Sequence, residues 1–183
     1  MKYYFISDDR LLLSGIKEIT QEIAGSSLFL NPNEGIRHFS PDIGDIVVLA
    51  VENSEYRSLL MRIAYKKNCR LLILLDMPVV ATARTFFPWF APKKLNVEEF
   101  FTLLRKAKQA PCYRKKKPVS QKIIDIFTCL GSGHPVEEVI ESHNISAKYI
   151  HQAKRDILYK YGFMSCNSLA VLVCRDMLEM KRF

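Results

Sequence analysis

Polar side chains near the end of the sequence recur at the spacing of one helix face. Positions i, i+3, i+4, i+7 and i+11 share one side of an α-helix. They are occupied here by Lys148, His151, Gln152, Arg155 and Tyr159. An arginine can donate two hydrogen bonds to O6 and N7 of guanine, a glutamine can pair similarly with N6 and N7 of adenine, and lysine suits phosphate oxygens. The pattern indicates either a surface that reads the major groove of DNA or an ordinary solvated helix face.

A helix over about residues 147–161 is predicted to carry this polar face. Ser146 suits its N-cap, and the capped amide groups would also suit a phosphate. Gly162 suits its end, and Lys154 flanks the polar face. The opposite stripe is apolar, with Ile150, Ala153, Ile157 and Tyr161. The helix is therefore expected to bury one side and expose the other.

Three further helices are expected around this one. The first follows Ser120 as its N-cap, the second begins at Pro135, and the last follows Asn167. Asn144, which tolerates a left-handed backbone, separates the second helix from the one with the polar face. Two short helices joined by a tight turn, the second bearing bases, form a helix-turn-helix. Residues 119–183 are thus predicted to be an all-α, four-helix DNA-binding domain.

Residues 119–163 resemble, without a gap, the LuxR/FixJ-type helix-turn-helix of bacterial transcription regulators. The matching positions are Leu130, Gly133, Glu138, Val139, Ile145, Ser146, Ile150, Ile157, Leu158, Lys160 and Gly162. The sequence departs from the family pattern at Ile123, Asn144, Tyr149 and Ala153. The resemblance implies that His151, Gln152 and Arg155 face bases. It also implies that Lys148, Lys154 and Lys160 lie near the DNA backbone.

The last predicted helix carries an apolar stripe that has two interpretations. The stripe consists of Leu169, Leu172, Val173, Met177 and Met180. The family often dimerises through its last helix, which implies pairing of the last four of these residues across a two-fold axis. Alternatively, all four belong to the core of their own domain. The expected partners are double-stranded DNA and either a second copy or another LuxR-type regulator.

The first part of the chain alternates strand-like and helix-like segments. Continuous apolar runs are typical of strands covered on both faces, and strands separated by helices predict a parallel α/β sheet. The strands are expected at residues 3–7, 45–51 and 70–75. The helices are expected at residues 12–23, with Gly25 as the stop, at residues 56–67, and from Glu98 and Glu99 onward. Residues 81–90 break the alternation and leave too little room for a crossover helix.

This part of the chain resembles a response-regulator receiver domain, which implies a flavodoxin-like parallel sheet. Asp8 and Asp9 resemble the acidic pair that holds Mg²⁺ in that family, and Lys93 matches its lysine. Receiver chemistry also needs an aspartate to attack the phosphoryl donor, and counting along the third strand places Ala50 there. We expect a degenerate receiver-like domain with no metal and no aspartyl phosphorylation. Glu52 as a built-in mimic of phosphate is the alternative.

Two prolines and a run of bases separate the two parts of the chain. Residues 114–117 are four consecutive bases between Pro111 and Pro118, so residues 111–118 are predicted to be a linker between domains at 1–110 and 119–183. The formal charge is +8, of which +5 lies beyond Cys112. Excess charge of this sign favours an anionic partner. The basic run is either a solvated tether or a further contact with phosphate.

Several classes of protein are excluded by missing patterns. No stretch approaches the roughly 18 apolar residues of a membrane span, and acidic residues follow the start too soon for a secretory signal. The five cysteines have no C-x-x-C spacing, and neither a nucleotide-binding motif nor a nucleophile–base pattern is present. We expect a cytoplasmic protein without cofactor, catalysis or membrane partner. A sequence-specific transcription regulator is the leading interpretation, and an auxiliary heterodimer subunit is its alternative.

Overall fold

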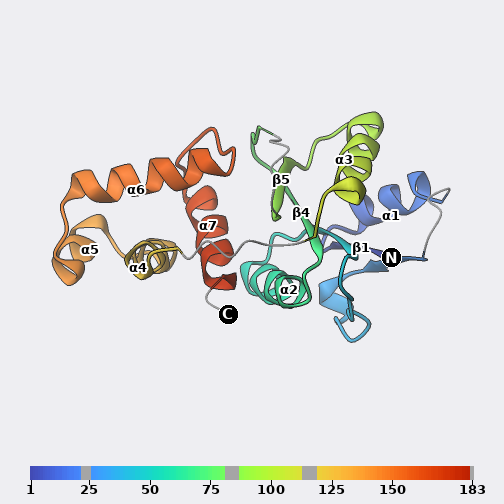
Figure 1. Cartoon of the computed structure of the whole chain (residues 1–183), viewed down its shortest axis with the longest axis horizontal. Helices are drawn as coiled ribbons and strands as arrows, with labels where there is room; N and C mark the ends of the chain where they lie inside the picture. The colour runs from blue at the N-terminus through green and yellow to red at the C-terminus, as the bar shows by residue number, and fades with distance from the viewer. Residues whose placement is uncertain (22–25, 81–86, 113–118, 182–183) are drawn as a thin grey trace. The chain divides into compact units, whose positions relative to one another are not determined.

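The computed structural model describes residues 1–21, 26–80, 87–112 and 119–181. The chain divides into two compact units, Met1–Arg114 and Lys115–Phe183 (Figure 1). Most of the predicted linker, residues 113–118, lies outside the described residues.

The first unit is built on a five-stranded sheet in which every neighbouring pair of strands is parallel. The strand order is β2-β1-β3-β4-β5. The strands are β1 (Lys2–Ser7), β2 (Ser26–Leu30), β3 (Ile46–Ala50), β4 (Arg70–Leu75) and β5 (Trp89–Pro92). The α/β prediction is therefore confirmed for this unit, and the three predicted strands correspond to β1, β3 and β4. Two strands, β2 and β5, were not predicted.

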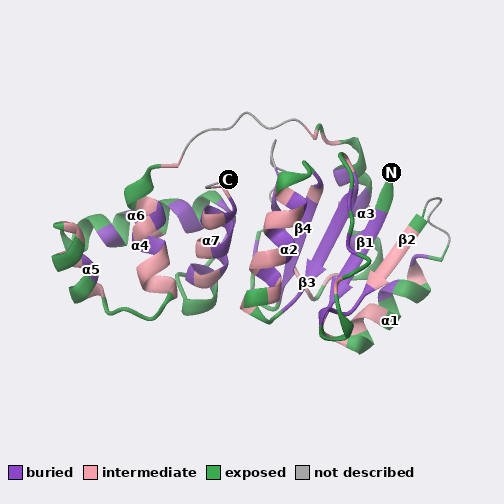
Figure 2. Ribbon diagram, turned by 90° about the horizontal axis from the view of Figure 1, so that it is seen from below, coloured by how far each residue is buried: buried purple, intermediate pink, exposed green. Residues whose placement is uncertain are grey.

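Helices cover both faces of this sheet (Figure 2). They are α1 (Arg10–Ile19), α2 (Ser54–Lys66) and α3 (Val97–Gln109). Phe5 and Val48, from the neighbouring strands β1 and β3, share one buried cluster with Ile16 of α1 and Phe100 of α3. Leu60 and Met61 of α2 are fully buried. Because both faces are covered, β3 can consist of apolar residues only, and all five are buried.

The first helix is shorter than predicted. It ends at Ile19 with Thr20 as C-cap, whereas the expected stop at Gly25 lies outside the described residues. The Thr20 hydroxyl donates to the Ile16 carbonyl at 2.6 Å, a local bond that competes with further helical hydrogen bonds. No helix lies in the described residues between β4 and β5, which agrees with the broken alternation predicted there.

In its described residues, 119–181, the second unit contains four helices at the predicted places. They are α4 (Gln121–Gly131), α5 (Val136–His143), α6 (Ala147–Lys160) and α7 (Ser168–Met180). Ile126, Val139 and Ile150 form a buried cluster that joins α4, α5 and α6. Two details differ from the prediction: Ser120 makes no side-chain capping bond, and Pro135 occupies the N-cap itself rather than the first turn.

Candidate nucleic-acid interface

One side of α6 is buried and the other is exposed, as the sequence predicted. The predicted inward stripe of Ile150, Ala153, Ile157 and Tyr161 is at most 8% exposed. The exposed residues of α6 include Lys148, His151, Gln152, Arg155, Tyr159 and Lys160. Lys154, predicted to flank this set, is partly buried. The amphipathic pattern therefore directs these polar side chains away from the core of the unit.

A tight turn fixes where α6 begins. Asn144 follows α5 with φ 48° and ψ 59°, a left-handed conformation that ends the helix. Ser146 is the N-cap of α6, and its hydroxyl accepts a hydrogen bond from the Tyr149 amide at 3.2 Å. Both predictions for this turn are confirmed. Three residues thus separate two helices, and the amino-terminal end of α6 is exposed together with Lys148.

The two side chains best suited to reading bases are already hydrogen-bonded to each other. One guanidinium nitrogen of Arg155 donates to Gln152 Oε1 at 3.3 Å, and Gln152 Nε2 donates to Asp156 Oδ1 at 2.7 Å. These bonds are exposed, so exchange with another partner costs little. Asp156 was missed by the sequence reasoning, although its i, i+4 spacing from Gln152 is a usable signal. Its carboxylate opposes an anionic partner at this face.

A lysine from another helix lies beside the start of α6. Lys122 Nζ of α4 is 5.5 Å from the centre of the Tyr149 ring, a cation–π distance. The Tyr149 side chain is 40% exposed. Lys122 therefore adds a base beside Tyr149 in the first turn of α6, which helical spacing within α6 could not reveal. The sequence signal was only that Tyr149 departs from the family pattern.

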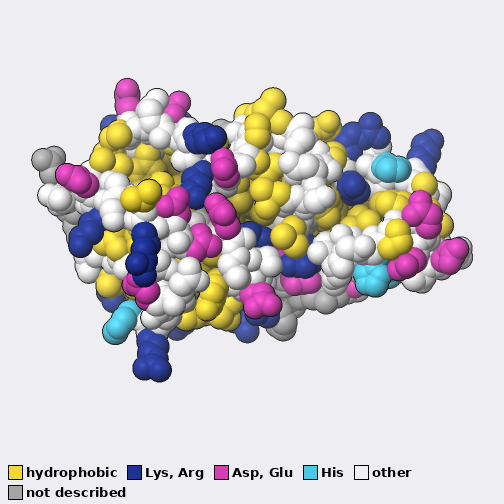
Figure 3. Space-filling view, turned by 180° about the vertical axis from the view of Figure 1, so that it is seen from behind, with side chains coloured by type: hydrophobic (Ala, Val, Ile, Leu, Met, Phe, Trp, Pro, Cys, Tyr) yellow, Lys and Arg dark blue, Asp and Glu magenta, His cyan; other side chains and the backbone are white. Residues whose placement is uncertain are grey.

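The basic and acidic side chains of the second unit are distributed unevenly among its helices. The described residues 119–181 contain seven bases and seven acids, so the net +5 beyond Cys112 comes from residues outside the described ranges. On α6, four bases accompany the single acid Asp156, whereas α5 carries Glu137, Glu138 and Glu141 and no lysine or arginine. On the face of the molecule drawn in Figure 3, basic and acidic side chains are interspersed. The described part of the unit therefore carries no net charge, and four of its seven bases lie on α6.

The apolar stripe of α7 is mostly interior. Val173 and Met177 are 0% exposed and Met180 is 1% exposed, while Leu172 is partly buried. Leu169, at the start of the helix, is 37% exposed. The interpretation of these residues as core therefore fits Val173, Met177 and Met180, and only Leu169 and Leu172 retain surface for a partner.

The receiver-like residues of the first unit lie at the ends of β1 and β3 and after β5. Asp9 caps α1 by accepting from the Leu11 and Leu12 amides at 3.0 and 3.1 Å. Lys93 Nζ lies 3.1 Å from Asp9 Oδ2 and 3.2 Å from Glu52 Oε1. Lys93 thus bridges the N-cap residue of α1 to the loop that follows β3.

The remaining groups at this edge are also held internally. Asp8 Oδ2 accepts hydrogen bonds from the Glu52 and Asn53 amides at 2.8 and 3.1 Å. Ala50 is the buried last residue of β3, and its carbonyl accepts from the Ser7 hydroxyl at 2.8 Å. Asp8 and Asp9 therefore act as caps for two different segments. Within the described residues, no three His, Cys, Asp or Glu side chains are grouped as metal ligands.

The pKa values at this edge follow from these bonds. The Leu12 amide, followed by the Lys93 ammonium, lowers the pKa of Asp9 below its ordinary value. Burial acts to lower the pKa of Lys93, but its hydrogen bonds to Asp9 and Glu52 outweigh burial and raise the pKa above its ordinary value. Asp9 and Lys93 are therefore both charged near neutral pH, and their charges compensate each other.

Comparison with known proteins gives structural likenesses only. No family model and no curated protein sequence matches the chain. Full-length FixJ from B. japonicum is 11% identical with a TM-score of 0.40, and each chain is 97% covered. RcsB from Salmonella typhimurium is 16% identical with a TM-score of 0.41, with 97% of this chain and 98% of that chain covered.

An RcsB–DNA complex is a further structural neighbour. It is 15% identical with a TM-score of 0.46, and 95% of this chain and 96% of that chain are covered. TM-scores of this size do not assign a function to the present chain. None of its described helices has both the length and the apolar character needed to cross a bilayer.

Proposed function

We propose that this chain is a sequence-specific DNA-binding transcription regulator that uses α6 in the major groove. The observation that carries the proposal is the exposed side of α6, with four bases on one helix of a unit whose described residues are otherwise acidic. The short α5, the left-handed Asn144 and the capped start of α6 support a helix-turn-helix arrangement. Double-stranded DNA is the partner, and such a regulator would act in the cytoplasm.

Within this proposal, the residues of α6 divide into two roles. His151, Gln152 and Arg155 lie on the exposed side and present groups that can pair with base edges. Lys148, Lys154, Lys160 and the amide end capped by Ser146 contact phosphates and fix the register on the duplex. Lys122, beside Tyr149, joins the second group.

Selection from a pool of randomised duplexes with the full chain tests this function. We expect enrichment of a common motif of a few base pairs, because base-edge contacts discriminate between sequences. The bound fraction should fall steeply with salt, since phosphate contacts release counterions. Recovery of DNA without any enriched motif would contradict sequence-specific recognition.

We further propose that phosphorylation of an aspartate does not control the first unit. Ala50 ends β3 where the receiver resemblance requires the phosphoacceptor, and a methyl group offers no nucleophile. Lys93 is already paired with Asp9 and Glu52. Incubation with acetyl phosphate and Mg²⁺, followed by intact mass measurement, should show no added phosphate, and a gain of one phosphoryl group would overturn the proposal.

Asp156 favours a second candidate function, that of an auxiliary subunit of another LuxR-type regulator. Its exposed carboxylate accepts from Gln152 in the middle of the DNA-binding face and weakens attraction to phosphate. A subunit of this kind would bind no specific site alone but would increase the affinity of its partner. Gel shifts of the chain alone, and then with such a regulator, distinguish the two functions.

A further inference from the structure

A thiol and an imidazole lie side by side between α4 and α5 of the second unit. Cys129 Sγ is 3.7 Å from His143 Nε2, which is within hydrogen-bonding distance for sulfur. Cys129 belongs to the last turn of α4 and His143 is the last residue of α5, so the fold brings together two residues that are 14 positions apart. Neither residue belongs to α6, and the DNA-binding proposal gives this pair no role.

The two side chains have the chemistry of a nucleophile and its base. A cysteine reacts as the thiolate rather than the thiol, and a neighbouring histidine is one of the groups that promote the thiolate. The Cys129 thiol can donate to His143 Nε2 when the ring proton is on Nδ1. Transfer of the thiol proton then leaves a thiolate beside an imidazolium, ready to attack an electrophile.

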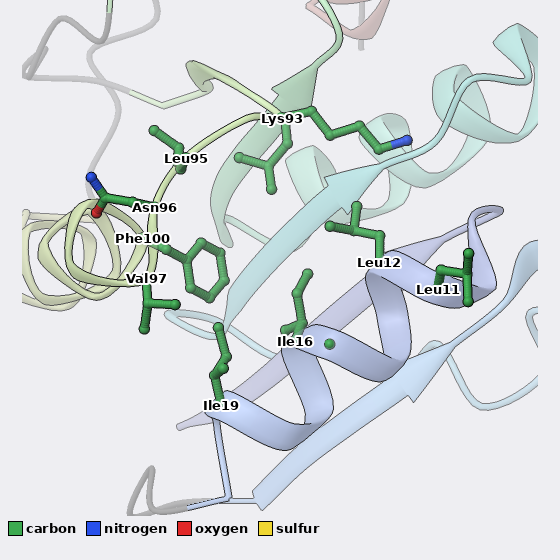
Figure 4. Close-up of a pocket in the computed structure, with 11 residues that line it drawn as sticks. Leu11, Leu12, Ile16, Ile19, Lys93, Leu95, Asn96, Val97 and Phe100 are labelled. Atoms are coloured by element: carbon green, nitrogen blue, oxygen red, sulfur yellow. The ribbon is translucent and has the colours of Figure 1, made fainter.

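The paired lysine of the first unit shows why the identity of the partner matters. Lys93 Nζ is bound to the carboxylates of Asp9 and Glu52, and Figure 4 shows its side chain extending away from Phe100, which lines an apolar groove of that unit. The two carboxylates hold the amine as an ammonium, which has no lone pair for attack. The imidazole of His143 does the reverse, because it accepts a proton from its neighbour.

The surroundings of Cys129 favour a small reagent. The side chains of Cys129 and His143 are both partly buried, and Cys129 packs against the cluster of Ile126, Val139 and Ile150. Because one side of the sulfur faces this apolar cluster, a bulky electrophile has little room. Hydrogen peroxide is only slightly larger than water and can reach a partly buried sulfur.

We propose that Cys129 and His143 form a site at which hydrogen peroxide oxidises the second unit. The thiolate attacks one peroxide oxygen, so that an S–O bond forms and the O–O bond breaks. The leaving hydroxide takes the proton that His143 received from the thiol and becomes water. The sulfur loses two electrons and becomes a sulfenic acid, while the peroxide gains them. External thiols reduce a sulfenic acid, so the modification is reversible.

The oxidised sulfur would lie beside the turn that positions α6. Asn144, the left-handed end of α5, directly follows His143, and the cluster in contact with Cys129 contains Val139 of α5 and Ile150 of α6. An added oxygen places a polar group against these apolar side chains, which costs free energy. Oxidation should therefore loosen the packing of α5 and α6. Its effect on DNA rests on the proposed function, whereas the reaction at the thiol does not.

Trapping of sulfenic acids with dimedone in the full chain, followed by peptide mass mapping, tests the reaction. After addition of hydrogen peroxide, Cys129 should be labelled on the order of 10-fold or more faster than Cys166, although Cys166 is exposed and Cys129 is not. His143→Gln should abolish this preference. His134→Gln is the matched control and should keep it, because His134 is an exposed histidine bonded to Glu138 rather than to a thiol.

Two results of this labelling would overturn the proposal. One is equal labelling of Cys129 and Cys166 in the wild type, a comparison that needs no variant and so does not depend on the stability of His143→Gln. The other is unchanged labelling of Cys129 in a His143→Gln variant whose circular dichroism shows that it is folded.

Fluorescence anisotropy with a selected duplex tests the effect on α6. Hydrogen peroxide should raise the Kd of the wild type by about fivefold or more, and dithiothreitol should restore it. Cys129→Ala should show no such response. An unchanged Kd after oxidation of Cys129 would overturn the coupling to α6. Failure of the proposed function would differ, because sequence preference would then be absent before any oxidant is added while Cys129 is still labelled.

Discussion

The charged residues at the carboxyl edge of the sheet and those on α6 differ in whether their partners lie within the same unit. At the carboxyl edge of the sheet, Lys93 pairs with Asp9 and Glu52, and Asp8 accepts two backbone amides. On α6, no acid in the described residues lies within ion-pair distance of a basic side chain. The first region satisfies its charges within its own unit, whereas the second directs them outward.

We interpret the charged residues at the edge of the sheet as stabilising the fold and those on α6 as binding a partner. A carboxylate that caps a helix and pairs with a lysine, as Asp9 does, stabilises the fold. Lysines that lack a partner on their own unit add little to stability, and the proposed function assigns those of α6 to phosphate contacts. Mutations in the two regions should therefore affect different measurements.

Arg155→Ala is expected to have the largest effect on DNA binding. Loss of the two hydrogen bonds from Arg155 to guanine should weaken the binding free energy for the selected sequence by about 1–3 kcal/mol. It should also relax the preference for one base pair. Fluorescence anisotropy with selected and random duplexes measures both. Arg105→Ala is the control, because Arg105 is also an exposed helical arginine bonded to a residue three positions earlier. Equal losses on both duplexes would show that Arg155 contacts no base.

Asp9→Ala is expected to lower stability without changing DNA affinity. The variant loses the α1 cap and the partner of Lys93, and loss of a cap alone costs about 0.5–2 kcal/mol. Urea unfolding of the full chain measures the change, with the exposed Glu141→Ala as control. If Asp9→Ala weakened DNA binding while stability was unchanged, Asp9 would have a role other than capping.

The ion pair between Asp9 and Lys93 also predicts how stability depends on pH. Stability should fall in acid because of Asp9 and in strong base because of Lys93. The lowered pKa of Asp9 adds stability that is complete above its ordinary pKa of 3.8 and is lost as the pH falls through the lowered pKa. The raised pKa of Lys93 adds stability that is complete below its ordinary pKa of 10.5 and is lost as the pH rises through the raised pKa. Unfolding curves of wild type and Asp9→Ala should therefore converge in strong acid, and a difference independent of pH would contradict this pairing.

Lys160→Ala should weaken binding to every duplex by a similar, smaller factor. A phosphate contact carries no sequence information, so the slope of log affinity against log salt should fall by about 1. Lys106→Ala on the exposed side of α3 is the control and should leave the slope unchanged. Loss restricted to the selected sequence would place Lys160 at a base.

Asp156→Asn is expected to have the smallest effect, with the opposite sign. Removal of one exposed carboxylate from the DNA-binding face should raise affinity for random DNA by about two- to fivefold at low salt. Asp125→Asn is the matched control, because Gln121 donates to Asp125 on α4 at the same 2.7 Å as Gln152 donates to Asp156. An unchanged affinity would show that Asp156 does not face the DNA.

The sequence predicted the parts of the fold in which local pattern and burial agree. The run that became β3 is apolar throughout because both faces of the strand are covered, and the exposed side of α6 follows from helical spacing. Strand β2, with the sequence SSLFL, lies at the edge of the sheet, and most of its residues are half-buried. Its hydrophobic pattern is therefore weak. The four-residue β5 is also an edge strand and ends in proline.

The candidate site was predictable only where one helix carries it. Side-chain periodicity predicted the exposure of Lys148 and Arg155, and cap chemistry predicted Ser146. The approach of Lys122 to Tyr149 depends on how α4 packs against α6, and the bridge from Lys93 to Glu52 joins residues 41 positions apart. Contacts of this kind are fixed by tertiary packing, which a single sequence does not reveal.

The ratio of affinities for a selected duplex and a random duplex, measured with the full chain at one fixed salt concentration near 150 mM, tests the central claim most directly. If α6 reads base edges, the selected duplex should bind about 10³-fold or more tightly. A ratio near one would mean that the basic side of α6 contacts phosphate alone, and the chain would not be a sequence-specific regulator acting on its own.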